Sequence, residues 1–142
     1  MLGLLIGNES PETIKKISNL SDERYDYCVF SRFALTEETK KIPQLQPIRA
    51  YSFQGTMVAT DIRGAEFMRT LVAPKKKYFY ITAMEWMNAT VLKYDDLKNI
   101  YLNDDIDLIV SNESDHKKIS QLFKEPVQII EDWNFQELQD ES

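Results

Sequence analysis

The chain has 142 residues, of which 43% are hydrophobic and 28% are charged. This is the size and composition of one globular domain, and no segment has the composition of a disordered or low-complexity region. The net charge of −6 argues against non-specific binding to nucleic acid or to an anionic membrane, because phosphate groups attract basic surfaces. We therefore expect residues 1–142 to form a single domain that binds neither.

The chain contains one cysteine, Cys28, inside an apolar run. A single cysteine cannot form an intramolecular disulfide, and a small buried thiol is typical of a reducing compartment. The apolar run at residues 1–7 is shorter than a signal peptide and has no basic flank. No run approaches the ~20 apolar residues of a membrane span. These features predict a cytoplasmic protein.

Short apolar runs recur along the chain, and most of them are continuous rather than alternating. Continuous runs rich in Ile, Val, Tyr and Phe are typical of strands that are buried on both faces of a parallel sheet. We predict strands at Leu2–Ile6, Tyr27–Phe30, Met57–Ala59, Tyr78–Thr82, Ile106–Val110 and Val127–Ile130.

The segment after the first strand has the pattern of an amphipathic helix. Ser10 is a favourable N-cap, and Pro11 suits the first helical position. Ile14, Ile17 and Leu20 then fall on one face. The spacing predicts a helix that covers the sheet.

Three further helices are predicted, within residues 61–74, 94–102 and 111–125. The last of them begins at Ser111 or Asn112, and the tail after Asn134 could add one or two helical turns. The side chains expected to face the sheet are Phe67, Met68, Leu71 and Val72 in the first, Leu97, Ile100 and Tyr101 in the second, and Ile119, Leu122 and Phe123 in the third.

Residues 33–53 contain two prolines and show little periodicity. We interpret them as a connection with a short helix at residues 36–41. One short strand could form at Ile48–Tyr51.

Strands that alternate with helices of about 10–15 residues imply βαβ units with right-handed crossovers. The predicted fold is α/β, a three-layer α/β/α sandwich with a mostly parallel, Rossmann-like sheet of about six strands. Its core should contain Ile6, Val29, Val58, Phe79, Ile81, Leu108, Val110 and Ile129.

Ligands of open parallel sheets bind beyond the carboxyl ends of the strands, near the point where the strand order reverses. The first strand is followed by Gly7, Asn8, Glu9 and Ser10, which lead into a helix N-terminus where backbone N–H groups can hold an anion. The loop lacks the further glycines of a dinucleotide fingerprint and has no Walker lysine. A tight turn before a capped helix explains the same residues, and Glu9 places a like charge beside any bound anion. These four residues are candidate ligand contacts.

Two other strand ends carry polar residues. Asp61 could contact a polar ligand, although Asp is also a preferred N-cap, and we favour the capping role. Glu85 and Trp86 follow the strand Tyr78–Thr82, and a carboxylate beside an aromatic ring suits a sugar or another flat, partly apolar ligand. An exposed strand-end glutamate beside a packed tryptophan is an equally good interpretation. Glu85 and Asp61 are thus candidate catalytic residues, and Trp86 is a candidate ligand contact.

The remaining reactive side chains favour structural roles. His116 lies in a polar helix pattern with no partner at a catalytic spacing, and Cys28 has no second thiol. The basic run Lys75–Lys77 is interpreted as the solvated entry to a strand. No zinc spacing or Ser/His/Asp pattern is present, so we predict no metal and no cofactor. Motifs alone do not establish catalysis.

Several features from Gly55 onward occur in a characteristic order: Thr60–Asp61 at a strand end, a strand with a KKxYFxxxxE pattern over Lys76–Glu85, and a strand ending at Ser111 that opens a helix. In this order and spacing the chain resembles the N-terminal half of a GT-B fold glycosyltransferase. The resemblance implies a sugar acceptor or a nucleotide-sugar as ligand, with Gly7 matching the glycine loop after the first strand.

GT-B enzymes hold the nucleotide-sugar in a second Rossmann-like domain, which we do not find in these residues. The resemblance therefore implies a domain that works with a partner chain or as a homo-oligomer. The alternative is a non-catalytic binding, regulatory or viral assembly module on a Rossmann-like scaffold, since the fold alone does not decide function.

Overall fold

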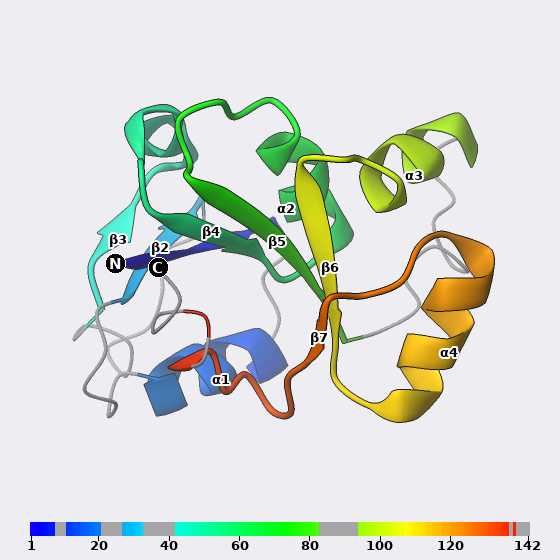
Figure 1. The fold of residues 1–142 in the computed structure, drawn as a ribbon. Coiled ribbons are helices and arrows are strands. Elements are labelled where there is room, and N and C mark those ends of the chain that lie inside the picture. Colours follow the sequence, from blue (N-terminus) through cyan, green and yellow to red (C-terminus); the bar gives the residue numbers. More distant parts are fainter. Residues whose placement is uncertain (8–10, 21–26, 33–41, 83–93, 137, 139–142) are drawn as a thin grey trace.

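The computed structural model describes residues 1–7, 11–20, 27–32, 42–82, 94–136 and 138 (Figure 1). The helix predicted at residues 36–41 lies outside these ranges.

The described residues form one seven-stranded sheet in which every pair of neighbouring strands is parallel. The order across the sheet is β3-β2-β1-β4-β5-β6-β7. The predicted α/β fold with a parallel, Rossmann-like sheet is confirmed. The strands are β1 (Leu2–Ile6), β2 (Tyr27–Ser31), β3 (Gln44–Leu45), β4 (Thr56–Ala59), β5 (Lys76–Ile81), β6 (Ile106–Val110) and β7 (Gln128–Ile129).

Helices cover both faces of the sheet (Figure 1). The connection from β1 to β2 crosses the sheet in one direction, and the connections from β4 to β7 cross it in the other. Right-handed crossovers therefore place their helices on opposite faces. The helices are α1 (Pro11–Leu20), the 3₁₀ helix η2 (Pro47–Ser52), α2 (Ile62–Met68), α3 (Tyr94–Tyr101) and α4 (Glu113–Leu122).

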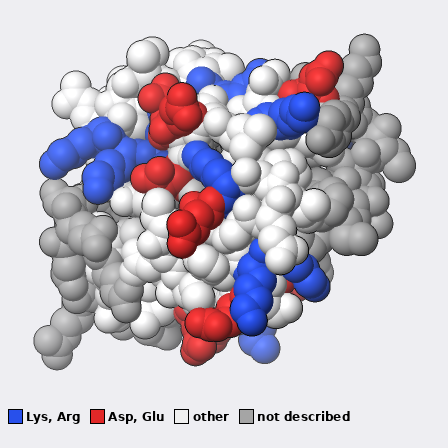
Figure 2. Space-filling view, turned by 45° about the vertical axis from the view of Figure 1, so that its right-hand side comes forward, with Lys and Arg blue, Asp and Glu red and all other residues white. Residues whose placement is uncertain are grey.

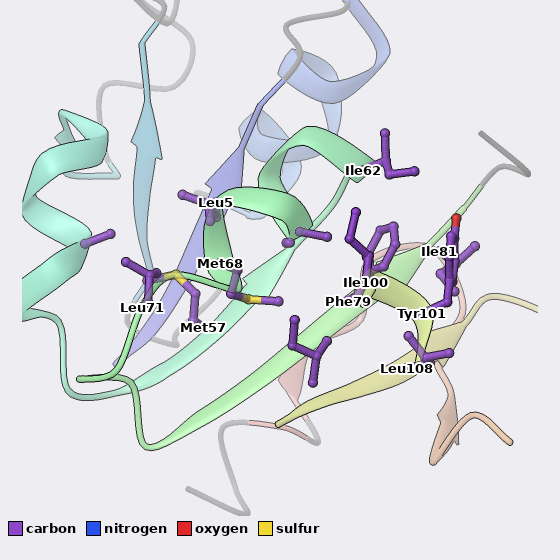
Figure 3. Close-up of a cluster of buried hydrophobic side chains, with 14 of the residues drawn as sticks. Leu5, Met57, Ile62, Met68, Leu71, Phe79, Ile81, Ile100, Tyr101 and Leu108 are labelled. Atoms are coloured by element: carbon purple, nitrogen blue, oxygen red, sulfur yellow. The ribbon is translucent and has the colours of Figure 1, made fainter. Parts of the chain in front are cut away.

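The face covered by η2, α2, α3 and α4, here called the α2 face, contains the larger core cluster (Figure 3). Met57 and Phe79 extend from the sheet toward Met68 of α2 and Ile100 of α3, and all four are almost completely buried. Continuous burial of this kind is what the unbroken apolar runs predicted.

The opposite face, here called the α1 face, is covered by α1 and by the chain after β7. Ile17 and Leu20 of α1 pack in the same cluster as Val58 of β4. The C-terminal segment, residues 130–136 and 138, adds Trp133 and Phe135 to this cluster. On the α1 face the C-terminal segment therefore covers part of the sheet beside α1.

A tight turn fixes the C-terminal segment to the sheet. The Tyr80 hydroxyl donates to the Ile130 carbonyl oxygen (2.5 Å) and accepts from the Trp133 backbone N–H (3.3 Å). Asp132 and Trp133 have φ values of 47° and 60°, a left-handed conformation that is uncommon for residues other than glycine. Lys16 of α1 forms an ion pair with Asp132. These contacts hold the turn against α1 and β5.

The structure confirms most of the predicted core. Ile6, Val29, Val58, Phe79, Ile81, Leu108 and Val110 are buried, whereas Ile129 is only half-buried on the edge strand β7. Cys28 is buried as predicted. Lys75 and Lys76 are exposed at the entry to β5, and Tyr78 to Ile81 are buried, whereas Thr82 is exposed.

One prediction about the connection after β2 was wrong, and one strand was missed. Ile48–Tyr51 is not a strand but lies within η2, because Pro47 at the first position favours a helical turn. The strand on this side of the sheet is the two-residue β3, whose Gln44 and Leu45 are both exposed. Such a short, exposed edge strand has no apolar signal in the sequence.

Two side chains predicted to face the core are exposed instead. The helix predicted to extend to Pro74 ends at Met68, and the following turn, in which Leu71 N–H bonds to the Met68 carbonyl, directs Val72 outward. Leu122 is exposed because α4 ends there, and Phe123 turns inward to stack on Tyr101 at a centroid distance of 4.4 Å.

The face shown in Figure 2 carries Lys and Arg side chains interspersed with Asp and Glu. Neither charge forms a large uninterrupted area among the described residues of this face. Among the helices that the structure describes, none is long and apolar enough to cross a membrane.

Candidate functional site

The strand order reverses between β1 and β4. From β1 the chain continues to β2 on one side, and from β4 it continues to β5 on the other. Leu5 and Ala59 are aligned across the two parallel strands, so the residues that follow them meet at the same carboxyl edge. This is the place where open α/β sheets bind ligands.

Asp61 connects the two strand ends. Its Oδ2 accepts a hydrogen bond from the Gly7 backbone N–H (2.8 Å), and its Oδ1 accepts one from the Gly64 backbone N–H (2.7 Å). The first bond joins the loop after β1 to the loop after β4, and the second caps α2. The predicted capping role of Asp61 is confirmed, and the residue is only 8% exposed.

Close packing at this junction requires glycine at two positions. A Cβ atom on Gly7 would lie 2.5 Å from Asp61 Oδ1 and 2.6 Å from the Gly64 nitrogen. A Cβ atom on Gly64 would lie 2.7 Å from the Leu5 carbonyl oxygen. Gly64, which weakens the helix by its propensity, therefore allows the first turn of α2 to approach β1.

The hydrogen bond between Gly7 and Asp61 limits the ligands that this edge can bind. The Gly7 N–H, part of the predicted anion-binding loop, already donates to a carboxylate of the protein. A phosphate brought to the same N–H would meet the negative charge of Asp61 at close range. An uncharged ligand meets no such repulsion.

Thr60 is the second polar residue at this junction. Side chains alternate along β4, and the Thr60 N–H still bonds to the Leu5 carbonyl oxygen (3.4 Å), so we infer that Thr60 points to the same α1 face as Val58. Ala59↔Phe79 is the last aligned pair of β4 and β5, and Thr60 directly follows it. Thr60 is 7% exposed, and its hydroxyl has no hydrogen-bond partner among the described residues.

An unsatisfied buried hydroxyl costs about 1–3 kcal/mol. A ligand or water that bonds to Thr60 would recover this free energy. The hydroxyl can both donate and accept, and it lies one residue before the carboxylate that holds the loop after β1. The junction therefore offers a hydroxyl suited to a polar, uncharged group.

The predicted site residues are only partly described. Gly7 and Asp61 are brought together, whereas Asn8, Glu9 and Ser10 and the pair Glu85 and Trp86 lie outside the described residues. Their proposed roles as ligand contacts or catalytic groups remain predictions.

Thr60 was the functional candidate that sequence reasoning underrated. Its position at a strand end was visible, but its place beside β1 depends on the strand order, which the sequence did not provide. The only available signal was a threonine and an aspartate directly after an apolar strand.

Other reactive groups lie away from this junction. Burial raises the pKa of the Cys28 thiol to about 11, so the thiol is protonated and unreactive near neutral pH. His116 is half-buried on α4. The described residues contain no group of three or more His, Cys, Asp or Glu side chains that could hold a metal ion.

Comparisons with known proteins do not extend this description: no protein-family model, curated protein or solved structure matches the chain.

Proposed function

We propose that the carboxyl edge between β1 and β4 binds a small, uncharged ligand rich in hydroxyl groups, such as a sugar or the sugar part of a nucleotide-sugar. The observation that carries this proposal is the buried Thr60 hydroxyl, which lacks a partner among the described residues and lies at the reversal of strand order beside Asp61.

The chemistry of the junction favours a sugar over a phosphate. A sugar hydroxyl can donate to or accept from Thr60, and it is not repelled by the Asp61 carboxylate. The resemblance to the acceptor-side half of a GT-B glycosyltransferase supports the same ligand class. In this proposal Asp61 is a positioning residue, because both of its oxygens accept backbone hydrogen bonds that shape the loop.

Ligand binding at this edge is compatible with two functions: half of a glycosyltransferase that works with a partner chain or as an oligomer, and a non-catalytic binding module. Only the first function includes transfer of a glycosyl group. A transfer assay with the isolated chain therefore cannot test binding, and the experiment has to measure binding itself.

The chain offers a matched pair of variants. Thr56 is the first residue of β4 and Thr60 directly follows its last residue, and both hydroxyls are buried without a partner in the described part of the chain. Only Thr60 lies at the carboxyl edge. Thr→Val keeps the shape of the side chain and removes the hydroxyl. Each variant should therefore raise the stability of the free protein, by about 1 kcal/mol if the lost group was unsatisfied.

The test is a thermal-shift titration with glucose, N-acetylglucosamine, UDP-glucose and UDP at millimolar concentrations. A ligand that binds only the folded state stabilises it by ~2.7 kcal/mol at a hundred times its dissociation constant. We expect glucose, N-acetylglucosamine or UDP-glucose to raise the melting temperature of the wild type and of Thr56→Val, and to act at least tenfold more weakly on Thr60→Val. UDP is the control that lacks a hexose. No response to any of the three hexose compounds, or an equal response in both variants, would overturn the proposal.

A further inference from the structure

Exposed apolar side chains line the edge of the sheet opposite to the proposed ligand site. The amino edge is formed by the loops and turns that lead into the strands. The large hydrophobic residues exposed in these segments are Met1 before β1, Ile48 and Tyr51 before β4, Val72 before β5, Leu102 before β6, and Leu122 and Val127 before β7.

Neighbouring segments of this edge contact one another. The Lys75 N–H donates to the Gly55 carbonyl oxygen (3.0 Å), and a Cβ atom on Gly55 would lie 2.6 Å from the Met1 carbonyl oxygen. Lys124 Nζ donates to the carbonyl oxygens of Asn103 (2.6 Å) and Ile106 (2.5 Å). In Figure 1 the loop before β5 and the turn before β6 lie along the same border of the sheet. Because Lys77 also pairs with Ile106, the segments before β1, β4, β5, β6 and β7 are neighbours along one border of the sheet, here called the strip.

Val72 is the most exposed of these side chains, at 92%. It lies in the loop sequence Leu71-Val72-Ala73-Pro74, where the flanking Leu71 and Pro74 are buried. Surface loops are usually built from polar residues and glycine. An apolar loop that presents a valine to solvent, with Leu102 exposed at the entry to the next strand, is typical of a contact surface.

The charges on this strip are arranged in two groups. Lys75 and Lys76 are exposed at the entry to β5, and Asp104 and Asp105 are exposed at the entry to β6. The register Lys77↔Ile106 places the two groups side by side. The strip is therefore basic over β5, and over β6 the two aspartates outnumber the one cation, Lys124, that contacts the same turn.

This arrangement is complementary to itself. A two-fold axis that passes between β5 and β6 would bring the basic group of one copy against the acidic group of the other, and the acidic group against the basic one. An isologous interface requires such self-complementarity, because each contact between two different groups occurs twice, once with each copy supplying the first group. Opposite charges at the rim favour this pairing and oppose alternatives.

We propose that the amino edge is a two-fold interface with a second copy of this chain. Val72 and Leu102 fill its centre, and the lysine pair of each copy faces the aspartate pair of the other. A typical interface covers about 800 Å² on each partner, roughly a tenth of the 8241 Å² surface of this chain. The dimer leaves the carboxyl edge open, so this inference does not depend on the proposed ligand.

The first test is sedimentation velocity over a range of concentrations. The wild type should show a concentration-dependent dimer. Val72→Asp places a charge in the centre of the interface and should weaken dimerisation at least tenfold. Leu45→Asp is the control, because Leu45 is also an exposed hydrophobic residue but lies on β3 at the far side of the sheet.

A charge-swap experiment tests whether the lysine group of one copy faces the aspartate group of the other. Lys75→Glu combined with Lys76→Glu makes both charge groups acidic, and Asp104→Lys combined with Asp105→Lys makes both groups basic. Each double variant alone should be monomeric because like charges then meet at both contacts. An equimolar mixture of the two should restore the dimer.

Three results would overturn the proposal. They are a monomeric wild type at the highest concentration studied, a dimer unaffected by Val72→Asp, and a mixture of the two charge variants that stays monomeric. Circular dichroism of each variant verifies that it is folded.

Discussion

Asp61 accepts a hydrogen bond of 2.8 Å from the backbone N–H of Gly7, which lies 54 residues earlier in the chain. The same carboxylate caps α2 through Gly64. One side chain thus fixes the relative positions of the β1 end, the β4 end and the helix that follows. The shape of the proposed ligand site depends on this junction.

Removing the Asp61 carboxylate should lower stability more than the loss of an ordinary helix cap. An N-cap replaced by Ala costs about 1 kcal/mol, and a hydrogen bond to a charged group contributes about 1.5–3 kcal/mol. We expect Asp61→Ala to lower the free energy of unfolding by about 2–4 kcal/mol, measured by urea denaturation. Asn112→Ala removes the exposed N-cap of α4 and should cost only about 1 kcal/mol. Equal losses in the two variants would show that the bond to Gly7 contributes nothing.

Gly64→Ala provides a test in which helix propensity and packing act in opposite directions. Alanine favours an exposed helix interior over glycine by about 1 kcal/mol, but a Cβ atom here would lie 2.7 Å from the Leu5 carbonyl oxygen. Because the obstructing atom is backbone, we expect a net loss of about 2 kcal/mol or more in urea denaturation. A more stable variant would show that α2 does not need this close approach to β1.

The Tyr80 hydroxyl should stabilise the C-terminal segment. Tyr80→Phe removes the donor to Ile130 and leaves the Trp133 N–H without its acceptor. The expected loss is about 1–3 kcal/mol, together with faster hydrogen exchange in residues 130–136. Tyr78→Phe on the same face of β5 is the control, because the described contacts include no hydrogen bond from its hydroxyl. An unchanged exchange rate in Tyr80→Phe would contradict this role.

Stability should decrease at alkaline pH through Cys28. Burial raises the pKa of its thiol from 9.0 to about 11 in the folded protein. The unfolded state therefore loses the thiol proton first, so this contribution is fully present below about pH 9 and is lost as pH rises toward about 11. The free energy of unfolding, measured between pH 8 and 11, should fall more steeply with pH in the wild type than in Cys28→Ala. The difference in slope corresponds to the release of up to one additional proton on unfolding. Parallel curves would contradict the raised pKa.

The fold was predictable where the sequence carried local signals. Unbroken apolar runs such as Tyr27–Phe30 correspond to strands buried on both faces, and Asp61 and Asn112 marked the starts of two helices. β3 was missed because two exposed residues carry no apolar pattern. Val72 and Leu122 were misplaced because each lies where a helix ends and its 3.6-residue period no longer applies.

The candidate site was less predictable because it depends on contacts between distant residues. The sequence marked Gly7 and Asp61 separately, each at the end of a strand. Their hydrogen bond forms because β1 pairs with β4, although β2 and β3 lie between these two strands in the sequence. The unsatisfied Thr60 hydroxyl likewise becomes visible only when the neighbours on the α1 face are known.

The central claim is that an uncharged, hydroxyl-rich ligand binds where β1 and β4 end, and residue-resolved NMR titration tests it most directly. The backbone amide signals of Gly7, Thr60, Asp61 and Gly64 would be followed while glucose, N-acetylglucosamine or UDP-glucose is added to millimolar concentration. The account predicts saturable shifts concentrated on these four residues, which are weakened at least tenfold in Thr60→Val and retained in Thr56→Val. Shifts concentrated elsewhere, or no saturable shift with any of the three compounds, would contradict it.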